Sequence, residues 1–176
     1  MKYNAKKLAV SAMLTAVAVA LSTFSVPIGA SKCFPIQHLC NVMAGVFLGP
    51  FYGVAMAFCT SLIRNLMGTG SLLAFPGSMV GAYLGAFLYQ HSRKLSLAYV
   101  GEIFGTGILG GLLCYPVAVQ LMGKEVAVFF YVMPFLLSTL CGTAVAAVLI
   151  GLLVKSGAFA YLRHILEENE QAVRLP

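Results

Sequence analysis

The sequence predicts an all-α integral membrane protein, folded as a bundle of six transmembrane helices. The chain of 176 residues is 60% hydrophobic and only 9% charged. Its mean hydropathy of +0.93 lies far above that of soluble domains. A membrane-spanning helix needs roughly 20 apolar residues, and the polar and Gly/Pro breaks of this chain leave room for about six such segments.

The expected helices follow one another at 7–27, 35–49, 51–67, 71–90, 96–121 and 127–154. Residues 1–155 would form one six-helix membrane domain. The remaining 156–176 would be a cytoplasmic polar tail. Its last ten residues, EENEQAVRLP, would fray into water, because they are charged and lack apolar periodicity.

Two segments allow an alternative interpretation. The second is short, and only Gly49 and Pro50 separate it from the third, so one long bent helix with an odd number of spans is the alternative. The first has the basic start and apolar run of a secretory signal. Retaining it as a helix gives the more consistent distribution of charge.

Basic residues favour six spans with both termini in the cytoplasm, since Lys and Arg next to membrane helices stay preferentially on that side. On this topology the cytoplasmic set is Lys2, Lys6, Lys7, Arg93, Lys94, Lys155, Arg163 and Arg174. The outer set is Lys32, Arg64 and Lys124. The net charge of +6 therefore needs no nucleic-acid partner, and no basic stripe with interleaved aromatic residues is present.

Small residues recur at helical spacing in three segments, and such stripes let helices approach closely in lipid. We expect the glycines to make contacts inside the bundle. The alanines either pack inside it as well or form a docking face for another membrane protein. The alanines are Ala9, Ala12, Ala16 and Ala20, and the glycines are Gly77, Gly81, Gly85, Gly101, Gly105, Gly107, Gly110 and Gly111.

Glu102 is the one acidic residue inside an expected span, and the chain contains no Asp. An intramembrane carboxylate is costly, which makes it a functional candidate. It lies near the cytoplasmic end of the fifth segment, away from the outer polar residues. A structural bond to a neighbouring helix, ligand contact and proton transfer are the open interpretations.

The outer polar residues gather in SKCFPIQHLCN (31–41) and at the end of the third segment. His38 and Asn41 are three apart and hence share a helix face; with Gln37 they either cap the helix or face a pocket. Arg64 either reaches the membrane interface, braces the loops or contacts a ligand. The five cysteines are scattered without a CxxC pair, which favours small buried residues over a metal site.

Catalytic motifs are missing. A Ser-His-Asp triad lacks its Asp, and no GxxxxGK[ST] loop is present to bind ATP. We therefore expect no enzyme activity and no cofactor. Uphill transport would draw its energy from a partner or an ion gradient, and the alternative that needs no partner is a proton-coupled carrier that uses Glu102.

The strings KCFPIQHLCNV, LGPFYG, RNLMGTGSLLAFPGSM, GEIFGTGILGGLLCYPVA and MGKEVAVFF, spread over about Lys7 to Val154, resemble the ThiW family. The six-span pattern with an alanine-striped first helix is similar to the substrate-binding S components of energy-coupling factor (ECF) transporters. The resemblance implies a bacterial cytoplasmic-membrane protein that captures hydroxyethylthiazole, the thiazole precursor of thiamine, in an outward-facing pocket. It also implies that the first helix docks on a transmembrane T component, which works with two ATPase subunits that consume the ATP.

Hydroxyethylthiazole is small and neutral, so its pocket calls for hydrogen-bond donors and aromatic or Met walls. Hydroxymethylpyrimidine is neutral too, whereas thiamine is a cation and would call for a buried carboxylate. An anionic vitamin could bind Lys32 and Arg64. We expect 31–35 to act as a lid. The expected binding residues are Lys32, Gln37, His38, Asn41, Asn65, Phe75, Met79, Glu102, Tyr115, Gln120 and Tyr131, and the expected docking residues are Ala9, Ala12, Ala16 and Ala20.

Overall fold

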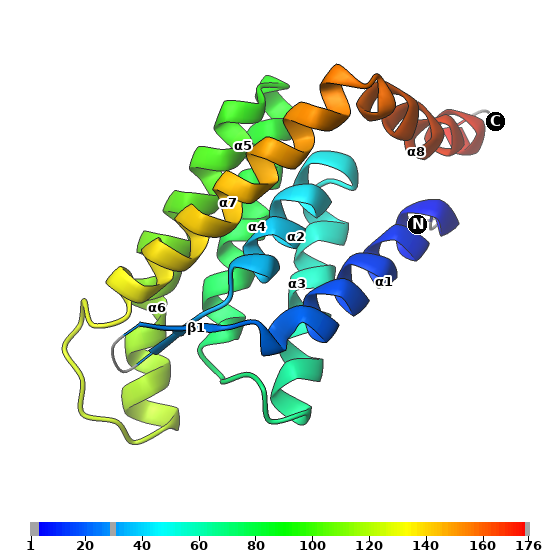
Figure 1. Cartoon of the computed structure of the whole chain (residues 1–176). Coiled ribbons are helices and arrows are strands. Elements are labelled where there is room, and N and C mark those ends of the chain that lie inside the picture. The colour runs from blue at the N-terminus through cyan, green and yellow to red at the C-terminus, as the bar shows by residue number, and fades with distance from the viewer. Residues whose placement is uncertain (1–3, 29–30, 175–176) are drawn as a thin grey trace.

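The computed structural model describes residues 4–28 and 31–174, apart from the side chains of residues 26, 28, 31, 32 and 168–174. It is a helical bundle with one short hairpin (Figure 1), so the helical prediction is confirmed. The elements are α1 (Ala5–Ala20), η1 (Leu21–Thr23), β1 (Val26–Ile28), β2 (Ser31–Cys33), α2 (Pro35–Phe47), α3 (Pro50–Leu66), α4 (Ala74–Ser92), α5 (Leu95–Glu102), η2 (Ile103–Gly110), α6 (Gly111–Pro116), η3 (Val117–Leu121), α7 (Val132–Lys155) and α8 (Ala158–Arg174). The consecutive elements α5 to η3 form one continuous helical rod, hereafter the rod.

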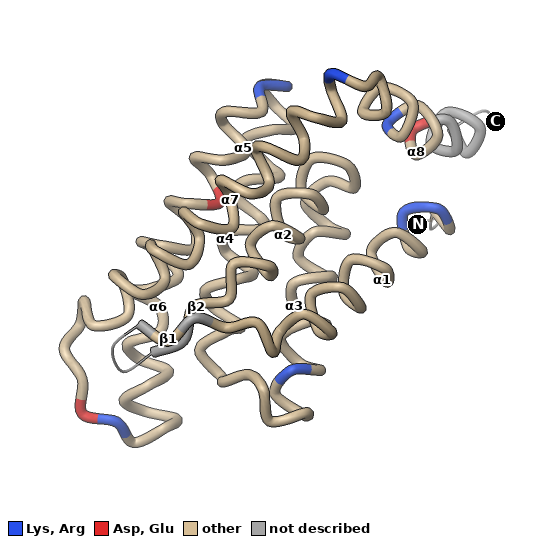
Figure 2. The backbone as a smooth tube through the Cα atoms, viewed as in Figure 1, with Lys and Arg blue, Asp and Glu red and all other residues tan. Residues whose placement is uncertain are grey.

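The bundle has two distinct ends. The β1–β2 hairpin, the 67–73 loop and the 122–131 loop lie together at one, hereafter the loop end (Figure 1). The start of α1 and the whole of α8 lie at the other, hereafter the terminal end. Figure 2 shows basic residues gathered at the terminal end, where the chain places Lys6, Lys7, Arg93, Lys94, Lys155 and Arg163.

The first helix is shorter than expected. It starts at Asn4, whose side chain accepts a hydrogen bond from the Lys7 backbone N–H at 3.2 Å, and this N-cap satisfies a donor that the helix leaves free. It ends at Ala20, whereas the sequence analysis extended it to residue 27. Because Pro27 lacks an N–H and disfavours helical backbone in the residue before it, the chain leaves the helix and pairs Val26 with Cys33 in an antiparallel hairpin.

The second and third expected helices are separate, so the single bent helix is wrong. Gly49 has φ +88, a conformation that residues with a Cβ rarely adopt, and Pro50 opens α3 at its first position. The two helices fold back side by side (Figure 1). With 13 residues, α2 is only about 20 Å long.

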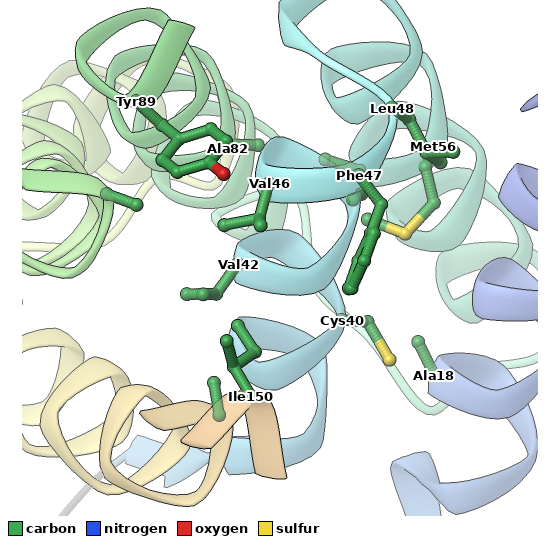
Figure 3. Close-up of a cluster of buried hydrophobic side chains, with 14 of the residues drawn as sticks. Ala18, Cys40, Val42, Val46, Phe47, Leu48, Met56, Ala82, Tyr89 and Ile150 are labelled. Carbon is green, nitrogen blue, oxygen red and sulfur yellow. The ribbon is translucent and has the colours of Figure 1, made fainter. Parts of the chain in front are cut away.

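Helix α2 is the centre of the bundle, with α1, α3, α4 and α7 packed around it. Most of its residues are buried, and the buried set includes the polar side chains of Gln37, His38 and Asn41. In lipid, close packing of this kind supplies the attraction between helices. Figure 3 shows the core around α2 and labels Ala18, Cys40, Val42, Val46, Phe47, Leu48, Met56, Ala82, Tyr89 and Ile150.

Helix α4 and the rod are in backbone contact, which confirms the prediction for the glycine stripes. A Cβ added to Gly101 would lie 2.7 Å from the Gly85 Cα, and one added to Gly105 would lie 2.8 Å from the Gly81 Cα. Any side chain at these positions would push the two helices apart.

Three stretches of the described chain are long and apolar enough to cross a membrane: 5–23, 95–121 and 132–155. The rod contains two π-helical segments, η2 and η3. Since α2 and α3 have 13 and 17 residues, they are shorter than a typical span of roughly 20 residues. Length and composition therefore identify three spans among the described residues, fewer than the six expected.

The sequence analysis expected no helix after residue 154, whereas the chain continues as α8 from Ala158 to Arg174. Leu166 is buried, and its carbonyl accepts a hydrogen bond from Asn4 Nδ2 at 3.0 Å. The Phe159 ring lies 5.2 Å from the Phe47 ring. The sequence analysis weighed only the charged last ten residues, whereas apolar residues just before them give α8 a face that packs on the bundle.

Candidate functional site

A cavity of about 420 Å³ opens at the loop end. Its lining comes from six parts of the chain that are far apart in sequence: the hairpin region, α2, the end of α3, the 67–73 loop with the start of α4, the 122–131 loop and α7. The part of the lining used below is Phe34, Gln37, His38, Arg64, Thr69, Ser71, Ser78, Lys124, Tyr131, Phe135 and Ser138.

Three of the expected binding residues line this cavity: Gln37, His38 and Tyr131. Asn41 and Glu102 lie beneath it, in hydrogen-bond contact with each other, and Glu102 also contacts His38. The side chain of Lys32 lies outside the described residues.

The other expected binding residues do not line the cavity. Asn65 Nδ2 donates to the carbonyls of Ser61 and Ser71, at 2.7 and 3.0 Å, and so anchors the 67–73 loop. Phe75 packs against Phe58, with ring centroids 5.6 Å apart. The remaining three lie on helix faces that do not line the cavity: Met79, Tyr115 and Gln120.

The expected separation of Glu102 from the outer polar residues is wrong. His38 Nδ1 lies 3.0 Å from Glu102 Oε1, and both side chains are buried. The reason is helix length. At 1.5 Å per residue, His38 lies about 13 Å from the Phe47 end of α2, and Glu102 lies about 10 Å from the Leu95 end of the rod. The short α2 therefore brings its first turns to the depth of Glu102.

Glu102 accepts two further hydrogen bonds, one from α2 and one from the next turn of its own rod. Asn41 Nδ2 donates to Oε1 at 3.0 Å, and Thr106 Oγ1 donates to the same oxygen at 3.1 Å. The second oxygen, Oε2, is buried without a hydrogen-bond partner. Gly81 leaves the space in which Oε2 lies, since a Cβ there would come within 2.8 Å of it.

This network fixes the orientation of the His38 ring. Because Nδ1 faces Glu102, the other ring nitrogen, Nε2, is the one left for the cavity that His38 lines. A carboxylate that holds one nitrogen of a histidine sets the tautomer at the other. The arrangement can therefore present a defined hydrogen-bonding group to a ligand.

Arg64 forms one wall of the cavity. It is 1% exposed, so the interpretation in which it reaches the membrane interface is wrong. Its guanidinium donates to Gln37 Oε1 and to the Thr69 carbonyl, and it stacks on the Phe34 ring at 3.8 Å. Arg64 thus joins α3, α2 and the 67–73 loop.

Residues of α7 close the cavity from the other side, and sequence reasoning missed them. Ser138 Oγ accepts a hydrogen bond from the Phe34 N–H at 2.8 Å, which ties the end of the hairpin to α7. Phe135 and Ser138 are three apart, a spacing that places both on one face. Burial raises the pKa of the Tyr131 phenol above its usual value, so the hydroxyl stays protonated as a donor.

The cysteines are free, and Cys33, Cys40 and Cys114 are buried as expected. The same expectation is wrong for Cys59 and Cys141, which are exposed on the bundle surface. Within the described residues, no group of three or more His, Cys, Asp or Glu side chains is gathered as a metal site.

The alanine stripe of α1 points away from the bundle. Ala9, Ala12, Ala16 and Ala20 are all exposed, whereas the residues of α1 that face α2 and α3 include Ser11. The interpretation in which these alanines pack inside the bundle is therefore wrong.

The chain thus combines apolar helices of membrane-spanning length with a small-molecule cavity at one end of the bundle. No curated protein sequence matches it. A family model described as thiamine-precursor transporter protein (ThiW) matches residues 8–156, and this range contains every described element from the alanine stripe to the end of α7. The chain therefore belongs to the ThiW family of thiamine-precursor transporter proteins.

Proposed function

We propose that the protein is the substrate-capture (S) subunit of an ATP-driven ECF vitamin transporter, and that it binds hydroxyethylthiazole in the loop-end cavity. The observation that carries this proposal is the cavity itself. Its volume of about 420 Å³ is within the range of about 300 to 1,000 Å³ that is usual for small-molecule sites.

The lining suits a small heteroaromatic alcohol. Phe34, Phe135 and Tyr131 supply aromatic surface, and His38 and Ser138 supply hydrogen-bonding groups. A ring nitrogen and a hydroxyl need such groups at fixed positions. Membership of the ThiW family supports a thiamine precursor as the ligand class.

We further propose that the bundle crosses a bacterial cytoplasmic membrane six times, with α1, α2, α3, α4, the rod and α7, and that both termini lie in the cytoplasm. The basic residues at the terminal end support this orientation under the positive-inside rule. The cavity would then open to the outside. The shorter α2 and α3 would be shielded from lipid in part by their neighbours, since α2 is mostly buried.

The exposed alanines of α1 are the proposed contact with a transmembrane T component. Small side chains permit close approach between helices in lipid. The chain needs no cofactor of its own in this scheme, because two ATPase subunits bound to the T component hydrolyse the ATP.

Isothermal titration calorimetry on the purified full-length chain tests the proposal. Hydroxyethylthiazole should bind without any partner subunit and should be recovered unchanged. Hydroxymethylpyrimidine and thiamine serve as the competing ligands. If one of these two binds and hydroxyethylthiazole does not, the proposed substrate is wrong and the proposed capture role stands. If none of the three ligands binds, the proposal is contradicted.

The second candidate is a self-sufficient proton-coupled carrier. Glu102 favours it, because this carboxyl group is buried beside His38 and one of its oxygens has no partner. Such a carrier would take up its substrate into liposomes under a pH gradient with no other subunit present, and Glu102→Gln would abolish the uptake. Uptake that requires ATPase subunits would eliminate this candidate.

A further inference from the structure

The strongest unexplained feature of the cavity is the charge of Arg64. Its guanidinium is buried and in contact with neutral groups: the Gln37 side chain, the Thr69 carbonyl and the Phe34 ring. Its Nε has no hydrogen-bond partner. A buried cation is costly unless an anion accompanies it.

The chain supplies no such anion among its described contacts. Of its five acidic residues, Glu102 is paired with His38 and Glu125 is exposed outside the cavity lining. The remaining three, Glu167, Glu168 and Glu170, belong to α8 at the terminal end. Described residues therefore place no carboxylate against Arg64.

Two other sources of positive potential reach the same cavity. Lys124 lines it from the 122–131 loop. The first residue of α4, Ala74, lines it as well. The N–H groups of Ala74 and Phe75 are bonded to backbone carbonyls of the preceding loop, so this helix start adds positive potential through its dipole and supplies no free donor. The N-terminal end of a helix carries partial positive charge and attracts anions.

Hydroxyl groups complete the set around this region of positive charge. Thr69 and Ser71 come from the glycine-containing loop between α3 and α4, and Ser78 follows on α4. Thr69 Oγ1 donates to the Arg64 carbonyl and Ser78 Oγ donates to Asn41 Oδ1, so Ser71 is the hydroxyl donor that this set offers to a ligand. A hydroxyl donor, an Arg and a helix start together are usual surroundings of a bound carboxylate or phosphate.

We propose that the cavity is an anion site, in which Arg64 and Lys124 hold the carboxylate or phosphate group of an anionic derivative of hydroxyethylthiazole, such as its phosphate ester. This proposal rests on the proposed function, because it names the charge class of the ligand that the same cavity takes. The thiazole ring would lie between the aromatic residues, and the anionic group would lie against Arg64.

The experiment compares three ligands on the purified full-length chain by calorimetry: hydroxyethylthiazole, its phosphate ester, and the analogue in which a carboxylate replaces the alcohol. An anionic ligand should bind at least about tenfold more tightly than the alcohol. Added salt should reduce that advantage, and inorganic phosphate should compete with the ester. Whether the ester or the carboxylate binds more tightly distinguishes the two anions.

Variants locate the effect. Lys124 lies at the exposed mouth of the cavity, so the Lys124→Gln variant should fold normally. Its preference for the anionic ligand over the alcohol should be several-fold smaller than that of the wild type. Lys155→Gln removes the same charge at the exposed terminal end and is the matched control; it should leave the preference unchanged. Arg64→Lys keeps the charge but loses the planar group, and Arg64→Gln loses both, so the preference should fall further in the second variant.

Each outcome separates this proposal from the proposed function. If the alcohol binds and neither anion binds more tightly, the anion site is wrong and the capture role stands. If inorganic phosphate binds and Lys124→Gln weakens it while no thiazole compound binds, the anion site stands and the thiazole ligand is wrong. If none of the probes binds, both are wrong.

Discussion

His38 Nδ1 lies 3.0 Å from Glu102 Oε1, although the two residues are 64 positions apart in the chain. This contact joins α2, the central helix, to the rod at the floor of the cavity. Asn41 and Thr106 donate to the same Glu102 oxygen. The carboxylate therefore organises the residues beneath the ligand site as well as the ring of His38.

Glu102→Ala should destabilise the bundle more than Glu102→Gln. Alanine leaves the Thr106 hydroxyl buried without its acceptor, and such a group costs about 1 to 3 kcal/mol. Asn41 Nδ2 loses one of its acceptors and keeps its bonds to Ser78. Glutamine keeps an oxygen acceptor in nearly the same volume. Thermal or denaturant unfolding of the two variants in detergent measures the difference. Equal loss of stability would show that the hydrogen bonds to Glu102 contribute little.

Gly81→Ala should destabilise the bundle by about 1 to 3 kcal/mol, the usual cost of overpacking a tight core. The new Cβ would overlap Thr106 Oγ1 and come within 2.8 Å of Glu102 Oε2. Gly151→Ala on α7 is the matched control, because no atom lies within 4 Å of its Cβ position. Unfolding curves should show a lower free energy of unfolding for Gly81→Ala and no loss for Gly151→Ala. The same curve for both would contradict the assigned contact.

Phe34→Ala should weaken the binding of hydroxyethylthiazole by about tenfold, or about 1.4 kcal/mol. The ring forms part of the cavity wall and also stacks on Arg64. Phe129→Ala removes an equally large ring that is 70% exposed and outside the cavity lining, so its affinity should match that of the wild type. Calorimetry measures both. An unchanged affinity in Phe34→Ala would remove the end of the hairpin from the binding site.

Ala16→Phe should block energised uptake and leave ligand binding intact, if the exposed stripe of α1 is where a T component docks. A bulky ring would hold the two helices apart. Val17→Phe is the neighbouring control, since Val17 is also exposed but lies off the stripe. Uptake in cells that carry all subunits, compared with binding by each purified variant, separates the two steps. Equal uptake by both variants would place the docking face elsewhere.

The sequence predicted those contacts that a simple period encodes. Glycines repeated every four residues form one stripe, so close helix contacts inside the bundle followed from spacing. The pairing of Gly81 on α4 with Gly105 on the rod is seen only in the structure. The alanine stripe has the same kind of period, yet spacing cannot say which face of α1 meets the bundle. Only the packed structure shows that Ala12 and Ala16 face outward.

The contacts of the site were predicted less well, because they depend on how far along the bundle axis each helix begins. His38 and Glu102 meet because α2 is short. The sequence analysis placed them apart because Glu102 is near the cytoplasmic end of its segment, whereas His38 is near the outer end of its own. Phe34 was expected only as part of the 31–35 lid, and Ser138 was missed, since their contact joins residues 104 positions apart. For Arg64 the sequence left three interpretations open, and its burial excludes the one in which the side chain reaches the membrane interface.

The backbone contacts between α4 and the rod also bear on how a ligand enters. Since Gly77 and Gly110 would touch through any added Cβ, at 2.5 Å from the Gly77 Cα, these two helices have no side-chain layer to rearrange between them. We therefore expect α4 and the rod to stay packed together when a ligand enters. We expect the doorway to lie instead where the hairpin meets α7, because this contact depends on two hydrogen bonds, from Cys33 Sγ to the Pro134 carbonyl and from the Phe34 N–H to Ser138 Oγ.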